Sequence, residues 1–413
     1  MNFHNQQQGN SYGRGGFRGG RGGGRQQGGR THHPKPTTGM QAEGGQRPPV
    51  ELCKFYTKGI QCNNGNNCRF SHDISAAFTL PAHEQAIYSL SVFHHPSEGP
   101  MIVSGSADST IKIWDLKAIS PQNVQPFQLI RTKGKVTHLE MSSNIVVCAV
   151  DEPMGDKADI TVGTVYLYAS PDTPIPVHRS DDMPYTHPFG EIRSFALFFH
   201  ETAKVIVTGG GEGLVRAWKF DPATNKFELL SVFEGHVRAV TSVLLHDQYL
   251  WTGSLDHSIR VWEVASGRCL GALTSSNNGK GHTGPVSCLV LTPAGPQNEL
   301  HIASGSSDQE VKLWKPNGEF VHSVSHSAWV TALCPFQDTH GGIPVLLVGL
   351  ADGSIVIRSS VTMNLIYIID AHFLNTHTIW SIVSIGQSCF SSAGEDGVIV
   401  TWKADKPLQE VKA

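Results

Sequence analysis

The sequence predicts an all-β fold whose main part, residues 76–413, is a seven-bladed β-propeller. The first observation is a repeat whose units end 44 to 54 residues apart, a spacing typical of propeller blades. The second is the alternation of apolar and polar residues within each unit, as in Ile111-Lys112-Ile113-Trp114, which indicates β-strands. The third is a sharp turn, with Gly and an acidic residue, ahead of most closing strands.

Residues 1–50 precede the repeats, and their composition cannot form a core. They contain three Arg-Gly-Gly (RGG) units that begin at Arg14, Arg18 and Arg21. Seven basic residues against the single Glu43 give the stretch a net charge of +6. We therefore expect a disordered arm that binds RNA weakly, through phosphate attraction and guanidinium stacking. A solubilising tail is the alternative.

Residues 51–73 carry Cys53, Cys62, Cys68 and His72 at the spacing C-x8-C-x5-C-x3-H. Three thiolates and one imidazole form a donor set that zinc accepts at structural sites, with no coordination position left for a reactive water. The segment holds few apolar side chains, so burial cannot offset the entropy of ordering it, and the ion must supply the stability. The sequence therefore predicts one structural Zn²⁺.

The stretch ELCKFYTKGIQCNNGNNCRFSHD resembles the CCCH zinc fingers of RNA-binding proteins. The resemblance implies recognition of single-stranded RNA, with bases stacked on Tyr56 and Phe70. The basic residues expected near phosphates are Lys54, Lys58 and Arg69. We expect Phe55 to lie in the small core of the finger. DNA is a less favoured ligand, because a finger without a recognition helix reads the major groove poorly.

Seven units account for the main part of the chain. The residues that close them are Trp114, Tyr168, Trp218, Trp262, Trp314, Arg358 and Trp402. Six units have a strong turn, whose acidic residues are Asp108, Glu212, Asp256, Asp308, Asp352 and Asp396. The second unit is weaker, and Asp151 and Glu152 lie in an enlarged hairpin that we expect to be solvated.

These units resemble WD40 repeats over essentially all of residues 76–413. In that family a His, a Ser or Thr, the turn Asp and the closing Trp form a buried hydrogen-bond chain. The matching residues are His236, Thr252, Asp256 and Trp262 in blade four, and His282, Ser304, Asp308 and Trp314 in blade five. The resemblance implies that His83, His326 and His372 hold the equivalent place in blades one, six and seven. With the histidines in the scaffold, no acid–base pair stands out, and we expect no enzyme activity.

Blade seven needs an outer strand to close the ring. The candidates are residues 78–80, which lie ahead of blade one, and residues 408–411 near the end of the chain. We favour residues 78–80, because Phe78 to His83 has the pattern of an outer strand that leads into blade one.

The distribution of charge separates the roles of the two halves. The whole chain is −3 and residues 51–73 are +1, so residues 74–413 carry −10. An acidic propeller is a poor nucleic-acid surface, and we expect it to dock an unidentified protein partner. Tyr88 and Trp380 share a register in blades one and seven, and Trp329 lies at the mouth of blade six. We expect these aromatic residues to form the protein-binding surface.

One CCCH finger followed by seven WD40 repeats resembles the zinc-finger and WD40-repeat proteins described chiefly in plants. That resemblance implies nucleic-acid binding in a nuclear or cytoplasmic setting. Scattered cysteines suit a reducing compartment, and no apolar run has the length of a membrane span. The main hypothesis is an RNA-binding adaptor. The alternative is a substrate receptor or scaffold of a ubiquitin ligase, although blade one has Trp114-Asp115-Leu116-Lys117 in place of the Trp-Asp-x-Arg of such receptors.

Overall fold

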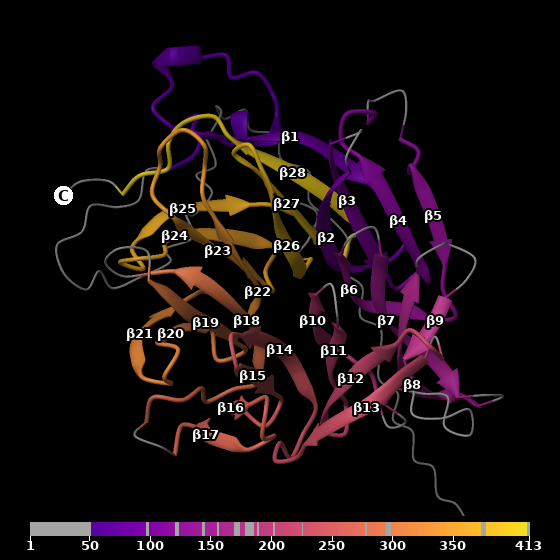
Figure 1. The fold of residues 1–413 in the computed structure, drawn as a ribbon. Helices are drawn as coiled ribbons and strands as arrows, with labels where there is room; N and C mark the ends of the chain where they lie inside the picture. The colour runs from indigo at the N-terminus through magenta and orange to yellow at the C-terminus, as the bar shows by residue number, and fades with distance from the viewer. Residues whose placement is uncertain are drawn as a thin grey trace, which may run out of the picture. The chain divides into compact units, whose positions relative to one another are not determined.

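The computed structural model describes residues 51–95, 99–119, 124–142, 145–154, 157–168, 174–177, 186–187, 190–200, 203–224, 226–276, 279–294, 299–372 and 377–410. The predicted arm, residues 1–50 with Arg14, Arg18 and Arg21, lies outside them. The described residues form seven four-stranded antiparallel sheets and two short 3-10 helices. These sheets are the blades of a closed ring (Figure 1), so the predicted all-β propeller with seven blades is confirmed.

Each of the first six blades is made of four consecutive strands, and the innermost strand comes first. Blade one contains β2 (Ile87–His95), β3 (Gly99–Ser106), β4 (Thr110–Asp115) and β5 (Gln128–Arg131). Blade two contains β6 (Lys135–Ser142), β7 (Ile145–Met154), β8 (Lys157–Tyr168) and β9 (Pro174–Val177). Blade three contains β10 (Ser194–His200), β11 (Ala203–Gly209), β12 (Val215–Asp221) and β13 (Lys226–Phe233).

The remaining blades follow the same order around the ring. Blade four contains β14 (Val240–His246), β15 (Tyr249–Ser254), β16 (Ile259–Glu263) and β17 (Cys269–Leu273). Blade five contains β18 (Val286–Pro293), β19 (Leu300–Ser306), β20 (Glu310–Trp314) and β21 (Phe320–Ser325). Blade six contains β22 (Val330–Phe336), β23 (Val345–Leu350), β24 (Ser354–Ser359) and β25 (Leu365–Asp370). Blade seven contains β26 (Ile379–Gly386), β27 (Cys389–Gly394), β28 (Val398–Ala404) and β1 (Ile74–Pro81).

The recurrent Gly of the repeat lets neighbouring blades pack closely. A Cβ atom at Gly105 of β3 would come within 2.5 Å of the side chains of Val136 and Leu139, which belong to the first strand of the next blade. Gly253 of β15 stands in the same relation to Val286 of β18, at 2.6 Å. Any larger residue would therefore push two blades apart, which explains in physical terms why the repeat contains this glycine.

The buried hydrogen-bond chain expected in the blades is present in blades one, four, five and seven. In blade four, His236 bonds through Nδ1 to Asp256 Oδ2 at 2.9 Å and through Nε2 to Thr252 Oγ1 at 2.8 Å. Trp262 Nε1 donates to the same Oγ1 at 2.9 Å. The equivalent histidines are His83, His282 and His372. These groups satisfy one another inside the blade, which supports a structural role for them.

Blade three contains the same hydrogen-bond chain, with a histidine that was not predicted from the sequence. His187 bonds to Glu212 Oε1 and to Thr208 Oγ1, each at 2.8 Å, and Trp218 Nε1 donates to Thr208 at 3.0 Å. Glu212 takes the place of the usual Asp. Irregular sequence around His187 hides the repeat, although its separation of 21 residues from Thr208 matches that of His83 from Ser104.

Blade six departs from the expected chain. Arg358 replaces the closing Trp and donates from Nε to His326 Nε2 at 3.1 Å. The turn residue Asp352 does not bond to His326; it accepts hydrogen bonds from Ser327 and Ser354. His326 therefore holds the expected place, but its partner is Arg358, because Val348 stands where blades one, three, four, five and seven have the hydroxyl of Ser or Thr.

The expectation of a solvated hairpin in blade two is wrong for Asp151 and Glu152, which are both buried. Asp151 forms a salt bridge of 3.0 Å with Lys135, and Glu152 accepts a hydrogen bond of 3.0 Å from the Tyr166 hydroxyl. Both carboxylates lie in β7 and have partners in neighbouring strands. A buried carboxylate is tolerated when it is paired in this way. The presence of acidic residues in the sequence therefore does not indicate that these two are buried.

Closure of the ring follows the favoured prediction. β1 pairs antiparallel with β28 from Ile74 opposite Ala404 to Pro81 opposite Val398. The C-terminal segment instead places Leu408, which is fully buried, against blade six. The Leu408 N–H donates to Asp338 Oδ2 at 2.9 Å. The strand that completes blade seven is thus the one directly after residues 51–73.

The propeller should lose stability as the pH falls from about 6.5 to about 4. Burial lowers the pKa of His83 to about 4 against the opposite effect of Asp108, and burial also lowers the pKa of His326 and His138 to about 4. In this interval the unfolded chain binds protons that the folded chain does not, so acid favours unfolding. Burial raises the pKa of Glu140 to about 7, and this single carboxyl opposes the trend. Melting temperatures measured from pH 7 to pH 4 should therefore fall. A melting temperature that does not change with pH in this interval would contradict the lowered pKa values of the buried histidines.

Candidate metal centre and binding surfaces

The segment before β1 folds into two turns held by backbone hydrogen bonds. The 3-10 helices are η1 (Tyr56–Lys58) and η2 (Gly65–Asn67). A short bridge joins the two ends of the segment, since Cys53 N donates to Ser71 O at 2.8 Å and Ser71 N donates to Glu51 O at 2.9 Å. This bridge brings the first cysteine beside the end of the segment.

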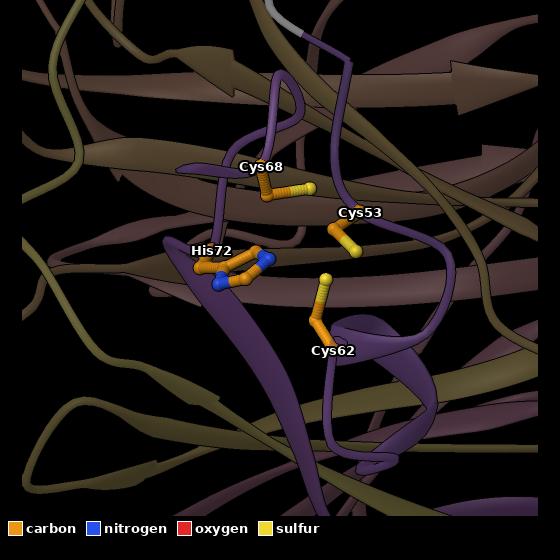
Figure 2. Close-up of side chains that lie close together, drawn as sticks. All are labelled: Cys53, Cys62, Cys68 and His72. Carbon is orange, nitrogen blue, oxygen red and sulfur yellow. The ribbon is translucent and has the colours of Figure 1, made fainter. Parts of the chain in front are cut away.

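The four predicted ligands come together at this bridge. Figure 2 shows the sulfur atoms of Cys53, Cys62 and Cys68 and the imidazole of His72 directed toward a common point. Their ligand atoms lie within 4.8 Å of one another. Zn–S bonds of about 2.3 Å place tetrahedral ligand atoms about 3.8 Å apart, so the arrangement fits one zinc ion.

Two further observations fit a metal at this point. His72 Nε2 is buried and has no hydrogen-bond partner among the described residues, as expected of a nitrogen that ligates a metal. Burial alone would raise the pKa of the Cys53 thiol, but the backbone N–H groups of Tyr56 and Phe55, together with His72 and Cys62, lower it to about 6. The Cys53 thiolate is therefore available at neutral pH. For the Cys68 thiol, the backbone N–H of Phe70 acts to lower the pKa, but burial and the adjacent Cys62 and Cys53 together raise it.

Tyr56 connects the metal site to the propeller. Its ring stacks on His72, with ring centroids 4.4 Å apart and planes 3° from parallel. Its hydroxyl donates to Asp405 Oδ2 at 3.1 Å, and Ser75 Oγ donates to the same oxygen at 2.6 Å. One face of the ring is thus occupied inside the protein, and a base can stack only on the face turned away from His72.

A second set of contacts fixes the finger to blades six and seven. The Tyr367 hydroxyl donates to Asp73 Oδ2, and Lys406 forms a salt bridge of 3.0 Å with Asp73. Asp405 N donates to Asp73 O at 2.8 Å, and Leu52 packs against the core shared by these blades. The finger is therefore docked on the propeller by polar and apolar contacts together.

Phe55 is exposed, which corrects the expectation that it lies in the finger's core. Its side chain is 60% exposed, and the nearby Ile60 is 52% exposed. Tyr56, whose ring packs against His72 and whose hydroxyl reaches Asp405, is half-buried, so Phe55 is the more exposed of the two adjacent rings. The outer surface of the finger therefore presents an aromatic ring that the sequence analysis did not select.

The other predicted nucleic-acid residues lie on or near the surface. Phe70 is half-buried, and the guanidinium of Arg69 lies over its ring at 4.6 Å from the centroid. Lys54 and Lys58 are exposed in and beside η1. With Phe55 and Ile60, these residues give the finger a surface that combines flat rings and cationic groups.

Of the predicted protein-binding aromatic residues, Tyr88 and Trp380 lie on the inner strands of blades one and seven, and Trp329 directly precedes the inner strand of blade six. Tyr88 and Trp380 meet edge to face, with ring centroids 5.7 Å apart. Trp380 is 38% exposed and Trp329 is 58% exposed. Tyr88 and Trp380 are therefore neighbours across the closure of the ring, as their shared register predicts.

Comparison with known proteins agrees with this architecture. Residues 51–73 match the family described as CCCH-type zinc finger. Residues 75–115, 227–263 and 268–315 match the family described as WD domain, G-beta repeat. Among the described residues, no helix has the length and apolar character needed to cross a membrane.

Several known proteins are similar in sequence to this chain. The zinc finger CCCH domain-containing protein 17 of Oryza sativa is 25% identical over 325 residues, which cover 76% of this chain and 65% of the rice protein. The zinc finger CCCH domain-containing protein 62 of Arabidopsis thaliana is 21% identical over 53% of this chain and 47% of its own length. The nuclear distribution protein nudF of Aspergillus niger is 23% identical over 63% of this chain and 56% of its own length. In each case the match covers less than two thirds of the relative.

Proposed function

We propose that this chain, a CCCH zinc-finger protein with a WD40-repeat propeller, is a non-enzymatic adaptor that holds single-stranded RNA on its finger and a protein on its propeller. CCCH fingers suggest nucleic-acid binding and WD40 propellers suggest protein interaction. The proposal adds the kind of nucleic acid, the residues that bind it and a nuclear or cytoplasmic setting.

The observation that carries the RNA proposal is the exposed aromatic and cationic surface of the finger. Phe55 is 60% exposed, so its ring is accessible to a ligand. The guanidinium of Arg69 lies 4.6 Å from the centroid of the Phe70 ring, so a planar cation and an aromatic ring are adjacent on the finger. Bases of single strands stack on such rings, and phosphates pair with such cations.

The shape of the finger favours single strands over duplex DNA. The described residues of the finger contain two 3-10 helices of three residues each and no α-helix. A helix or a two-stranded ribbon is what enters the major groove of DNA. The zinc ion supplies rigidity when bound, and the protein's own side chains make the contacts.

Alanine at Phe55 or Phe70 should weaken RNA binding while the fold is retained. One lost stacking interaction costs about 1–3 kcal/mol, so each change should raise the Kd roughly fivefold or more. Fluorescence anisotropy with a labelled single-stranded ribo-oligomer measures this. Phe127→Ala is the matched control, because Phe127 is also 60% exposed but lies in blade one.

In the same assay, Tyr56→Phe separates the effect of the aromatic ring from that of the contact between finger and propeller. It keeps the ring on His72 and removes only the hydrogen bond to Asp405. RNA affinity should remain close to that of the wild type, with a small fall in melting temperature. Wild-type affinity in both Phe55→Ala and Phe70→Ala would refute the proposed surface.

A further inference from the structure

The mouth of the propeller at blades six, seven and one carries both aromatic rings and carboxylates. We define the aromatic rim as Tyr88, Trp329, Trp380, Glu84, Asp352 and Glu395. Hydrogen bonds between neighbouring inner strands hold its members together. Leu90 N donates to Ser381 Oγ at 3.0 Å, and Thr331 Oγ1 donates to Ile379 O. The three rings each lie within two residues of one of these bonded positions.

Turns between strands bring the backbone of Asp352 and Glu395 close to the segments that carry Trp329 and Trp380. Ala351 N donates to Trp329 O at 2.9 Å, which brings Asp352 next to Trp329. Glu395 N donates to Thr378 O at 3.0 Å, two residues before Trp380. His83 N donates to Gly397 O at 3.0 Å, which brings the segment with Glu84 beside the turn that contains Glu395.

The charge of the rim is negative and accessible. Glu84, Asp352 and Glu395 are all exposed, and none of them forms a salt bridge within the described part of the chain. The nearby cations are engaged elsewhere: Lys112 donates to Ala82 O at 2.7 Å, and Arg358 donates to His326 and to Met363 O. Glu84 and Glu395 therefore present their carboxylates to whatever approaches the exposed rings. Asp352, whose carboxylate accepts hydrogen bonds from Ser327 and Ser354, adds its charge.

We propose that the aromatic rim binds an arginine-bearing segment of the protein partner. This inference rests on the proposed docking role of the propeller and names the class of partner. A guanidinium stacks on an exposed indole or phenol and at the same time forms paired hydrogen bonds with a carboxylate. Lysine offers a point charge with no flat face, so the rim favours arginine over lysine. The net charge of −10 on residues 74–413 attracts such a segment from a distance.

The test uses the full-length zinc-loaded protein and labelled synthetic peptides in an anisotropy titration. Three Gly/Ser peptides of equal length carry Arg, Lys or Glu at the same positions, and a fourth carries Leu. The Arg peptide should bind most tightly. Trp380→Ala and Trp329→Ala should each weaken it by roughly two- to fivefold. Because Trp329 is 58% exposed, its replacement leaves the fold intact even if loss of Trp380 disturbs blade seven.

Charge variants provide an independent readout. Glu84→Gln with Glu395→Gln should weaken Arg-peptide binding and reduce its dependence on salt. The matched control is Glu228→Gln with Glu299→Gln, which removes the same charge from exposed positions in other blades. Phe127→Ala serves as the control for loss of an exposed ring.

The outcomes separate this inference from the proposed docking role. Arg-peptide binding that is unaffected by the rim variants, or equal binding of the Arg and Glu peptides, would overturn the inference. If the Leu or Glu peptide binds best and depends on Trp329 and Trp380, the rim is a docking surface for another class of partner. If the rim variants change the affinity of none of the peptides, the rim has no docking role either.

Discussion

Replacement of both Ile74 and Leu80 by alanine should remove most of the free energy of unfolding of the propeller. Both side chains are almost fully buried, at 0% and 2% exposure, and they pack in two different core clusters on either side of blade seven. Each truncation should cost about 2–5 kcal/mol, against a total of about 5–15 kcal/mol for a typical domain. Because the two sites do not share a cluster, their effects should add.

Urea unfolding followed by tryptophan fluorescence measures this change, since five of the closing residues of the blades are buried tryptophans. Thr79→Ala is the control, because Thr79 is exposed on the same strand and its loss should change stability by less than about 0.5 kcal/mol. A double variant as stable as the wild type would mean that β1 does not close the ring in solution.

Replacement of His72 by alanine should abolish zinc binding and also lower the melting temperature of the propeller by a few degrees. Zinc contributes roughly 10–16 kcal/mol to small fingers, so residues 51–73 should unfold without it. Tyr56 then loses its stacking partner, and the hydrogen bond to Asp405, worth about 1 kcal/mol, is lost with it. Leu52 leaves the core of blades six and seven at the same time.

Metal content and melting temperature are measured on the same preparations. Tyr56→Phe should keep the metal and show a smaller fall in melting temperature, because only the contact between finger and propeller is weakened. An unchanged melting temperature after complete loss of zinc would show that the finger folds and unfolds independently of the ring.

Local spacing explains what could be predicted from the sequence. The ligands of the metal site lie within one short segment, so their intervals alone indicate the site. The blades repeat a turn and a closing Trp, and each repeat supplies its own evidence for the period. The neighbours Tyr88 and Trp380 could be paired because equivalent positions in adjacent blades must lie side by side.

The features that were missed depend on contacts between distant parts of the chain. Phe55 and Tyr56 are adjacent and chemically similar, and it is Tyr56 that stacks on His72 and bonds to Asp405 in the docked finger, while Phe55 stays exposed. His187 is hidden by the irregular sequence around it, and His326 pairs with Arg358, which lies 32 residues further along the chain. Long-range partners of this kind leave no periodic trace in the sequence.

Zinc-dependent binding of single-stranded RNA decides whether the finger is the RNA-binding element. The arm, with its net charge of +6, should contribute binding that weakens steeply with salt, so the comparison belongs at roughly 200 mM salt. Under these conditions the wild type should bind a labelled ribo-oligomer, and His72→Ala should bind it roughly tenfold more weakly or worse. Equal affinity of the zinc-free variant and the wild type would contradict the proposal that a metal-ordered finger holds the RNA.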